Sequence, residues 1–324
     1  MIEILSNGAL NLVQDLGRPA HLHLGVSPSG AMDAPALRIA NLLVGNDEGA
    51  AGIEICIFPF RVRFHADTWF ACAGAATTLS LPRRDYRCGY AVLARAGDLL
   101  TVAPPPQGSR VLIALRGGLD LPLVLGSRAT DLKSGFGGLQ GRGLRKGDAL
   151  ALGPTPDSAT PRAVGVVPPS RLQLVEELAE GCIAVRAMAG AEFEAFTEDA
   201  RQAFGSAEFK LTPDCNRQGY RLEGPPLKAA RPLELLSHGL VAGTVQVPPA
   251  GQAIVQMAEA NTCGGYPKIA TVIEADLWRL AQLRPGQRVR FTLVDHATAV
   301  QALRDQQAEL ARIRRGLALN AAGP

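Results

Sequence analysis

Alternation of apolar and polar residues dominates this chain and predicts strands more often than helices. Residues 52–64 (GIEICIFPFRVRF) alternate toward their end with the period of two that is typical of a half-buried strand. Residues 111–126 read as strand, turn, strand, with a glycine pair as the turn. A glycine-containing turn directly before an apolar strand occurs three times, at 95–100, 145–150 and 284–289. We therefore expect many short strands joined by tight turns.

Helical patterns are fewer and shorter. Residues 33–44 combine an apolar stripe with Asp33 as the N-cap and Gly45 just after the end. Two more helices are predicted at about 274–283 and 297–317, and the stretch 153–170 is rich in Pro, Ser and Thr without an apolar period. The predicted organisation is a first domain at 1–153, a linker at 154–180, a second domain at 181–296 and a helical tail at 297–324.

Composition agrees with a turn-rich β protein of two domains. The chain has 324 residues, of which 47% are hydrophobic and only 5% aromatic, with 35 Gly and 23 Pro. The formal net charge of +3 is too small to indicate a nucleic-acid partner. Because no apolar run approaches the ~20 residues of a spanning helix and no signal peptide opens the chain, we expect a cytoplasmic protein.

The cysteines and histidines do not form a recognisable metal site. The six cysteines contain no CxxC pair, so we expect reduced thiols and no zinc cluster. His21 and His23 are two residues apart, but no carboxylate or cysteine beside them completes a ligand set. We therefore expect no metal.

A glycine pair beside polar residues is the most informative motif. Gly264 and Gly265 allow a close backbone approach to a ligand, and Tyr266 and Lys268 follow them directly. Upstream, residues 216–227 add an amide and cationic groups, beginning with Asn216, Arg217 and Arg221. Such a set can hold a small polyanion or an amide-like substrate. The alternative is that the glycines serve tight turns and the cations are solvated.

Four polar residues are expected to share one pocket in the second half. Gln246 lies in a valine-rich strand, where an unpaired buried amide costs about 1–3 kcal/mol. If strands 244–247 and 253–257 pair, one pocket can be lined by Gln246, Glu259, Asn261 and Lys268.

The first half offers two further candidate sites. The polar loop 13–33 contains Gln14, Asp15 and Arg18, which can bind a substrate or simply stabilise the loop. The glycine-rich stretch 125–144 carries Arg128 and Arg142, whose guanidinium groups suit an anion. It contains no P-loop sequence, so a long turn-rich loop is the slightly favoured reading.

Taken together, these motifs resemble the biotin-dependent carboxyltransferase-type family. This family includes allophanate hydrolase subunit 2, the C subunit of 5-oxoprolinase, Kip-type antagonists and the matching part of urea carboxylase. The resemblance covers most of the chain. The segments whose motifs match the family are 13–19, 29–46, 117–130, 137–148, 217–227, 245–252 and 264–277. It implies a mainly β fold of two β-barrel, cyclophilin-like domains.

The resemblance also implies a function and a partner. It points to a component of an ATP-dependent amide or lactam hydrolase of the 5-oxoprolinase type, acting with a protein like allophanate hydrolase subunit 1 or the B subunit of 5-oxoprolinase. Lys268, Glu259 and Arg217 would be catalytic. ATP would be used by the complex, and this chain has no Met-Lys-Met biotin attachment sequence.

Two alternatives remain open at this point. The chain can be the carboxyltransferase component of a biotin-dependent urea or amide carboxylase, or a regulatory antagonist of a kinase inhibitor without chemistry of its own. Residues 259–263 read EANTC where the family commonly has DRQTT, and His238 stands where an acid is common. These departures change the charge of the expected site and give weight to the regulatory alternative.

Overall fold

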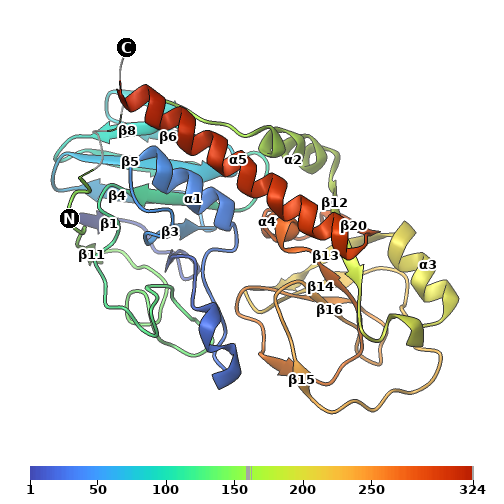
Figure 1. Cartoon of the computed structure of the whole chain (residues 1–324). Coiled ribbons are helices and arrows are strands. Elements are labelled where there is room, and N and C mark those ends of the chain that lie inside the picture. The colour runs from blue at the N-terminus through green and yellow to red at the C-terminus, as the bar shows by residue number, and fades with distance from the viewer. Residues whose placement is uncertain (158–160, 162, 323–324) are drawn as a thin grey trace. The chain divides into compact units, whose positions relative to one another are not determined.

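The computed structural model describes residues 1–157, 161 and 163–322 (Figure 1). Short strands make up most of its regular structure, so the mainly β fold class predicted from the sequence is confirmed. The chain divides into two compact units. Unit 1 comprises Met1–Arg18, Ser29–Leu172 and the end of the last helix from residue 308, and unit 2 comprises Pro19–Pro28 and Gln173–Gln307.

Unit 1 is built from two antiparallel sheets that enclose one core. The six-stranded sheet has the order β11-β1-β4-β9-β6-β7, with the bounds β1 (Ile2–Ile4), β4 (Phe60–Phe64), β6 (Thr78–Leu81), β7 (Arg84–Arg87), β9 (Leu99–Val102) and β11 (Ala149–Leu150). The five-stranded sheet has the order β2-β3-β10-β5-β8, with the bounds β2 (Leu12–Gln14), β3 (Gly52–Ile55), β5 (Thr68–Gly74), β8 (Ala91–Ala94) and β10 (Val111–Leu115). Alternate residues of both sheets, such as Phe60, Phe64, Ile53 and Ile113, form a single buried cluster.

Helix α1 (Ala34–Leu43) covers the other face of the five-stranded sheet. Asp33 is its N-cap, as predicted, and accepts a hydrogen bond from the backbone N–H of Ala36 at 3.0 Å. The fully buried Asp33 carboxylate also accepts hydrogen bonds from both terminal guanidinium nitrogens of Arg171, each at 2.5 Å. This pair ties the start of α2 (Pro169–Glu180) to α1.

Unit 2 contains a closed seven-stranded barrel. Its strands follow the order β12-β19-β16-β17-β14-β13-β20, with the bounds β12 (Cys182–Ala189), β13 (Glu208–Cys215), β14 (Gly219–Glu223), β16 (Thr244–Gln246), β17 (Ile254–Gln256), β19 (Lys268–Val272) and β20 (Arg288–Leu293). The parallel pairing of β12 with β20 closes the barrel, and the other pairs are antiparallel. A separate two-stranded sheet joins β15 (His238–Gly239) to β18 (Cys263–Gly264).

Side chains fill the interior of this barrel. Tyr220, Phe209 and Phe291 are at most 2% exposed, and the ring of Phe204 stacks on Phe291 with centroids 4.6 Å apart. Phe204 comes from α3 (Glu198–Ser206), and the remaining helices are short: η1 (Pro19–Leu24), η2 (Phe193–Ala195), η3 (Glu274–Asp276) and α4 (Leu277–Ala281). Any ligand must therefore bind outside the barrel core.

The three repeated glycine turns adopt the same conformation. Each glycine has a φ near +90°, a region that only glycine enters freely, and an added Cβ would meet nothing within 4 Å: Gly97, Gly147 and Gly286. In each turn the arginine N–H donates to the side chain three residues later, as seen in Asp98, Asp148 and Gln287. The turns lead into β9, β11 and β20, so backbone conformation alone explains this sequence pattern.

Several predicted elements differ from the structure in extent. The predicted strand 52–64 is two strands, β3 and β4, and the second strand expected within 111–126 is reduced to isolated bridges at Leu119 and Val124. The segment 154–180, expected to be a linker, contains α2. The predicted domain limits stay a prediction.

The last helix is longer than predicted and is not wholly solvated. Helix α5 runs over His296–Ala322. Its residues Leu310, Ile313 and Leu317 pack against the cluster that α1 forms with the five-stranded sheet of unit 1. This packing could not be predicted from the sequence, because the helix is only weakly amphipathic. A narrow apolar stripe does not reveal which surface will cover it. Within the described residues, no helix has both the length and the apolar character required to span a membrane.

We predict that Phe291→Ala destabilises unit 2 by about 3–5 kcal/mol, because it removes a fully buried ring and leaves a cavity. The measurement is chemical denaturation followed by circular dichroism. Leu293→Ala, two residues along the same strand and 37% exposed, is the matched control and should lose much less. Equal losses in the two variants would contradict the assignment of the barrel core.

Candidate functional site

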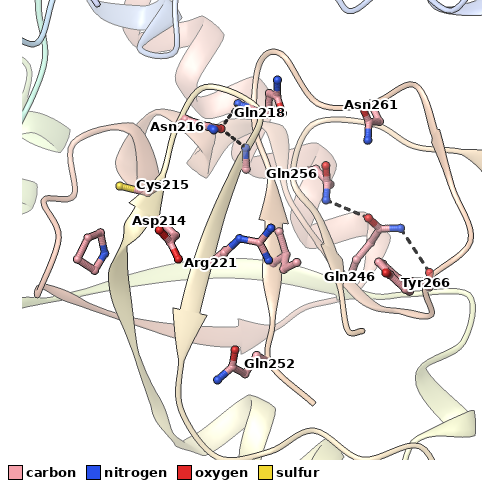
Figure 2. A pocket seen from close by; sticks show the side chains of 13 residues that line it. Asp214, Cys215, Asn216, Gln218, Arg221, Gln246, Gln252, Gln256, Asn261 and Tyr266 are labelled. Carbon is pink, nitrogen blue, oxygen red and sulfur yellow. Dashed lines mark hydrogen bonds between the residues drawn. The ribbon is translucent and has the colours of Figure 1, made fainter. Parts of the chain in front are cut away.

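A polar cavity of about 870 Å³ lies within unit 2 (Figure 2). Four barrel strands, β13, β14, β16 and β17, supply most of its lining, and the segment around β18 supplies Asn261 and Tyr266. Tyr220 and Val255 are directly paired and point into the filled barrel core. Because successive side chains of a strand point to opposite faces, Arg221 and Ile254 lie on the outward face. The cavity is therefore a pocket on the outside of the barrel.

The strand register aligns four side chains across this outward face. Arg221 pairs with Ile254, Ile254 pairs with Gln246, and Gln246 pairs with Lys268. Directly paired residues share a face, so these four form a cross-strand row over β14, β17, β16 and β19. At its last step the register shifts by a β-bulge between Val245 and Gln246, which sets Lys268 opposite Gln246. Three members of the row line the cavity, whereas Lys268 is next to Gln246 at its end.

Carboxamide side chains dominate the cavity lining. Six of its residues are amides: Asn216, Gln218, Gln246, Gln252, Gln256 and Asn261. A carboxamide both donates and accepts hydrogen bonds without carrying charge. The cavity is therefore suited to a neutral polar group such as an amide, a lactam or a urea.

Gln246 is oriented by a neighbour that the sequence did not single out. Gln256 donates from Nε2 to Oε1 of Gln246 at 2.9 Å, and Gln246 donates in turn to the carbonyl of Tyr266 at a long 3.5 Å. Both glutamines are at most 8% exposed. Pairing of β16 with β17, the condition for the expected pocket, is present, and it brings Gln246 and Asn261 to the cavity but not Glu259 or Lys268.

Asn216 has a structural task as well as a place in the cavity wall. Its Oδ1 accepts hydrogen bonds from the backbone N–H groups of Gln218 at 2.8 Å and Gly219 at 3.1 Å. This geometry shapes the turn between β13 and β14.

The glycine pair at 264–265 is required by close contacts within the protein. A Cβ on Gly264 would lie 2.9 Å from the amide nitrogen of Gln246, and one on Gly265 would lie 2.8 Å from the carbonyl oxygen of Leu235. Neither glycine adopts a positive φ. The pair therefore lets this segment approach Gln246 and the segment 235–239, which places Tyr266 at the cavity.

Lys268 is held in a small charged cluster. Its ammonium lies 2.8 Å from Oε2 of Glu192 and contacts Nε2 of His238, whose Nδ1 lies 2.8 Å from the carbonyl of Leu236. Burial raises the pKa of Glu192, but hydrogen bonds and the charge of Lys268 outweigh this and hold that pKa below its ordinary value. The ammonium is thus positioned by its neighbours and is not freely mobile.

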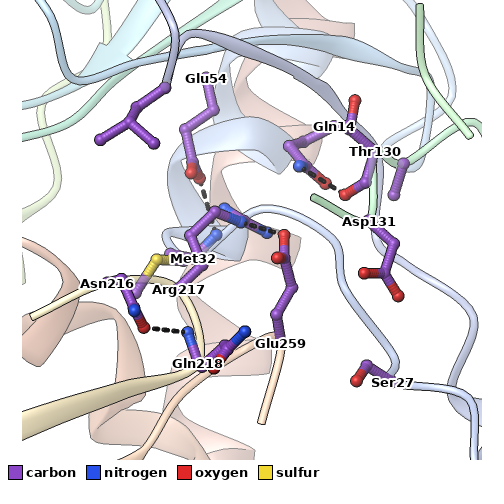
Figure 3. Close-up of polar contacts among 12 residues, drawn as sticks. Gln14, Ser27, Met32, Glu54, Thr130, Asp131, Asn216, Arg217, Gln218 and Glu259 are labelled. Carbon is purple, nitrogen blue, oxygen red and sulfur yellow. Dashed lines mark hydrogen bonds and ion pairs between the residues drawn. The ribbon is translucent and has the colours of Figure 1, made fainter. Parts of the chain in front are cut away.

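Arg217 and Glu259 form a buried ion pair (Figure 3). Arg217 Nε lies 2.5 Å from Glu259 Oε1, and the residues are 5% and 1% exposed. Their backbones are also joined, because the N–H of Glu259 donates to the carbonyl of Arg217 at 2.8 Å. Neither residue lines the cavity. The arrangement fastens the segment before β18 to the turn before β14.

Gln14, Asp15 and Arg18 all contact the glycine-rich loop of unit 1. Gln14 donates to the carbonyl of Thr130 at 3.0 Å (Figure 3), and Arg18 donates to the carbonyl of Ala129 at 2.5 Å. Asp15 accepts hydrogen bonds at 2.6–2.7 Å from three donors: Gly17 N–H, Ser127 Oγ and Arg128 N–H. These contacts match the structural alternative for the 13–33 motif, in which polar residues stabilise a loop.

The two arginines of that loop make separate contacts. Arg142 donates two hydrogen bonds of 2.8 Å to Asp148. Arg128 donates to the carbonyl of Leu121 at 2.7 Å and lies 3.7 Å from Asp120. The guanidinium fork of Arg142 is therefore occupied by a carboxylate of the protein itself. Among the residues that the structure describes, no three His, Cys, Asp or Glu side chains gather as a metal site.

The fold and the site together define a β-rich protein whose second unit is a closed barrel with an amide-lined pocket on its outer face. Residues 24–293 match the family model described as carboxyltransferase domain, subdomain A and B, and the chain belongs to this family. The family resemblance predicted from the motifs is thereby confirmed.

Comparison with individual proteins supports the same family. The chain is 42% identical over 307 residues to the 5-oxoprolinase C subunit of Escherichia coli, covering 95% of this chain and 96% of that protein. It is 37% identical to the 5-oxoprolinase C subunit of Haemophilus influenzae, covering 97% and 98%. Among solved structures, urea amidolyase of K. lactis matches with a TM-score of 0.88 and 29% identity, covering 96% of this chain but 20% of that one.

The Arg142–Asp148 pair makes a prediction about pH. Hydrogen bonds from Arg142 hold the pKa of Asp148 below its ordinary value of 3.8. A carboxyl with a lowered folded-state pKa contributes stability that is complete above its unfolded pKa and is lost as pH falls through the folded pKa. Asp148→Asn should therefore flatten the loss of unfolding free energy below about pH 4, measured by denaturation at stepped pH. The exposed Asp47→Asn is the control, and an identical pH profile in both variants would contradict the assignment.

Proposed function

We propose that this chain is one component of a hetero-oligomeric, ATP-dependent hydrolase that opens the lactam of 5-oxoproline to give glutamate. The observation that carries the proposal is the similarity, over almost the whole of both chains, to two proteins named as the C subunit of 5-oxoprolinase. The amide-lined cavity supports it, because a lactam offers one N–H donor and one carbonyl acceptor to carboxamide groups.

The site residues suit the requirements of lactam opening. Addition of water to the carbonyl carbon forms a C–O bond and develops negative charge on the carbonyl oxygen; collapse of this intermediate breaks the C–N bond, and a proton passes to the nitrogen. In this proposal Gln246 and Tyr266 orient the lactam, with Asn261 and Asn216 at the cavity wall. Lys268, next to Gln246 in the cross-strand row and fixed by Glu192, stabilises the developing charge or supplies the proton. Arg217 and Glu259 then act by positioning the surrounding segments.

The cavity itself is not suited to the triphosphate of ATP. Arg221 is the one cationic side chain among its lining residues, and a triphosphate usually requires several cations and a backbone cradle. In unit 1, Arg142 is engaged by Asp148. We therefore propose that ATP is used by the complex through the partner protein, which would resemble the B subunit of 5-oxoprolinase or allophanate hydrolase subunit 1. All six cysteines are free thiols, which suits a reducing cytoplasm.

The second candidate function is a carboxyltransferase component acting on urea or another amide. The structural match to urea amidolyase favours it, because the TM-score is 0.88. This chain spans only 20% of that protein. The activity of the whole urea amidolyase is therefore weaker support for a function of this chain than the full-length 5-oxoprolinase relatives are. A purely regulatory role is less favoured, because a binding protein without chemistry does not require an open cavity lined by six amides.

The decisive experiment is co-expression of this chain with a genomically neighbouring protein of related fold, followed by assay of the purified complex. We expect 5-oxoproline to stimulate phosphate release from ATP and glutamate to appear in equal amount. A stable complex that no lactam or amide stimulates would overturn the hydrolase proposal and favour the regulatory role. Stimulation by urea with bicarbonate and a biotinylated carrier would favour the carboxyltransferase.

Lys268→Ala should lower kcat of that complex by about 100-fold or more, because it removes the charge placed beside Gln246. Glu192→Gln is the companion variant: it keeps the ammonium but loses one ionic partner, so a smaller loss is expected. Thermal unfolding of each variant separates this effect from loss of fold. Full activity in Lys268→Ala would remove Lys268 from the mechanism.

A further inference from the structure

The cross-strand row contains a cation that no proposed step has used. Arg221 lines the cavity at the far end of the row from Lys268. Within the described part of the chain, its guanidinium makes no hydrogen bond or ion pair to another residue, whereas the guanidinium groups of Arg217 and Arg142 are engaged by carboxylates. An arginine whose five donors face a polar cavity is suited to bind a carboxylate of a ligand.

The strand register fixes the distance between Gln246 and Arg221 in the cavity wall. Gln246 and Arg221 flank Ile254 on neighbouring strands, so their backbones are about 10 Å apart, twice the spacing between strands. Ile254 and Pro213 are the aliphatic side chains among the lining residues, and Ile254 lies between Gln246 and Arg221. A small ring over Ile254 would have the Gln246 carboxamide on one side and the Arg221 guanidinium on the other.

We infer that Arg221 is the residue that selects for a carboxylate, so that the cavity takes a small acid carrying an amide in preference to a neutral amide. This inference rests on the proposed function and deepens it, because 5-oxoproline carries a carboxylate and a lactam on one five-membered ring. Urea and simple lactams lack the anionic group. The presence of Arg221 thus distinguishes a pocket that prefers a lactam acid from one that prefers urea.

One acidic residue lines the same cavity. Asp214 is among the lining residues together with Arg221. Within the described residues no ion pair joins the two groups. The charge of Asp214 repels a bound anion, so we expect the ligand carboxylate to lie against Arg221 and away from Asp214.

The test compares 5-oxoproline with 2-pyrrolidinone, the same lactam ring without the carboxylate. Isothermal titration calorimetry on the purified complex should give at least tenfold tighter binding of 5-oxoproline. Arg221→Met should weaken 5-oxoproline binding by about ten- to a hundredfold and leave 2-pyrrolidinone unchanged, because only a charge-assisted hydrogen bond is lost. Arg221→Lys should recover part of the preference. Arg290→Met, on barrel strand β20 and paired with Glu208, is the matched control and should keep the wild-type preference.

The outcomes separate this inference from the proposed function. Wild-type binding without preference for the carboxylate, no binding of either ligand, or an unchanged preference in Arg221→Met would overturn the inference. Turnover of 5-oxoproline with an unaltered KM in Arg221→Met would overturn the role of Arg221 while leaving the hydrolase function in place. Preferential binding that depends on Arg221, in a complex without lactam-stimulated turnover, would support the inference and overturn the hydrolase function.

Discussion

Closure of the seven-stranded barrel is the constraint on which the candidate site depends. The parallel pairing of β12 with β20 joins the first and last strands of the barrel, and closure leaves no unpaired edge. Its interior is filled by Phe209, Tyr220 and Phe291, which fixes the direction of every second side chain outward. Arg221, Ile254 and Gln246 form one row because of this register, and the β-bulge beside Gln246 adds Lys268 at its end.

The polar side chains in and around the site are held in place by contacts with one another. Gln256 orients Gln246, Glu192 holds Lys268, and Arg217 pairs with Glu259 at full burial. A buried polar group without a partner costs about 1–3 kcal/mol, so such contacts are needed for the fold as well as for binding. Preorganised amides and a fixed ammonium are also what an enzyme requires for acting on an amide bond. The same contacts therefore serve stability and the proposed chemistry.

Some of the residues singled out from the sequence lie at the cavity and others do not. Gln246, Asn216, Asn261 and Tyr266 line the cavity, and Lys268 stands beside it. Gln252, Gln256 and Gln218 were missed, because a lone glutamine in a strand carries no signal until its neighbours across the sheet are known. Gln14, Asp15 and Arg18 bind the 125–144 loop, a long-range contact that sequence spacing does not reveal.

The sequence by itself determined the local features: the glycine turns at Gly97, Gly147 and Gly286, the Asp33 cap of α1 and the mainly β character. These depend on φ angles, capping and alternation, which act over a few residues. The family was also readable, since its motifs follow one another along the chain. Only the tertiary structure decided which charges are engaged and which face the cavity. That choice depends on strand register, which pairs residues such as Arg221 and Ile254 that are far apart in the sequence.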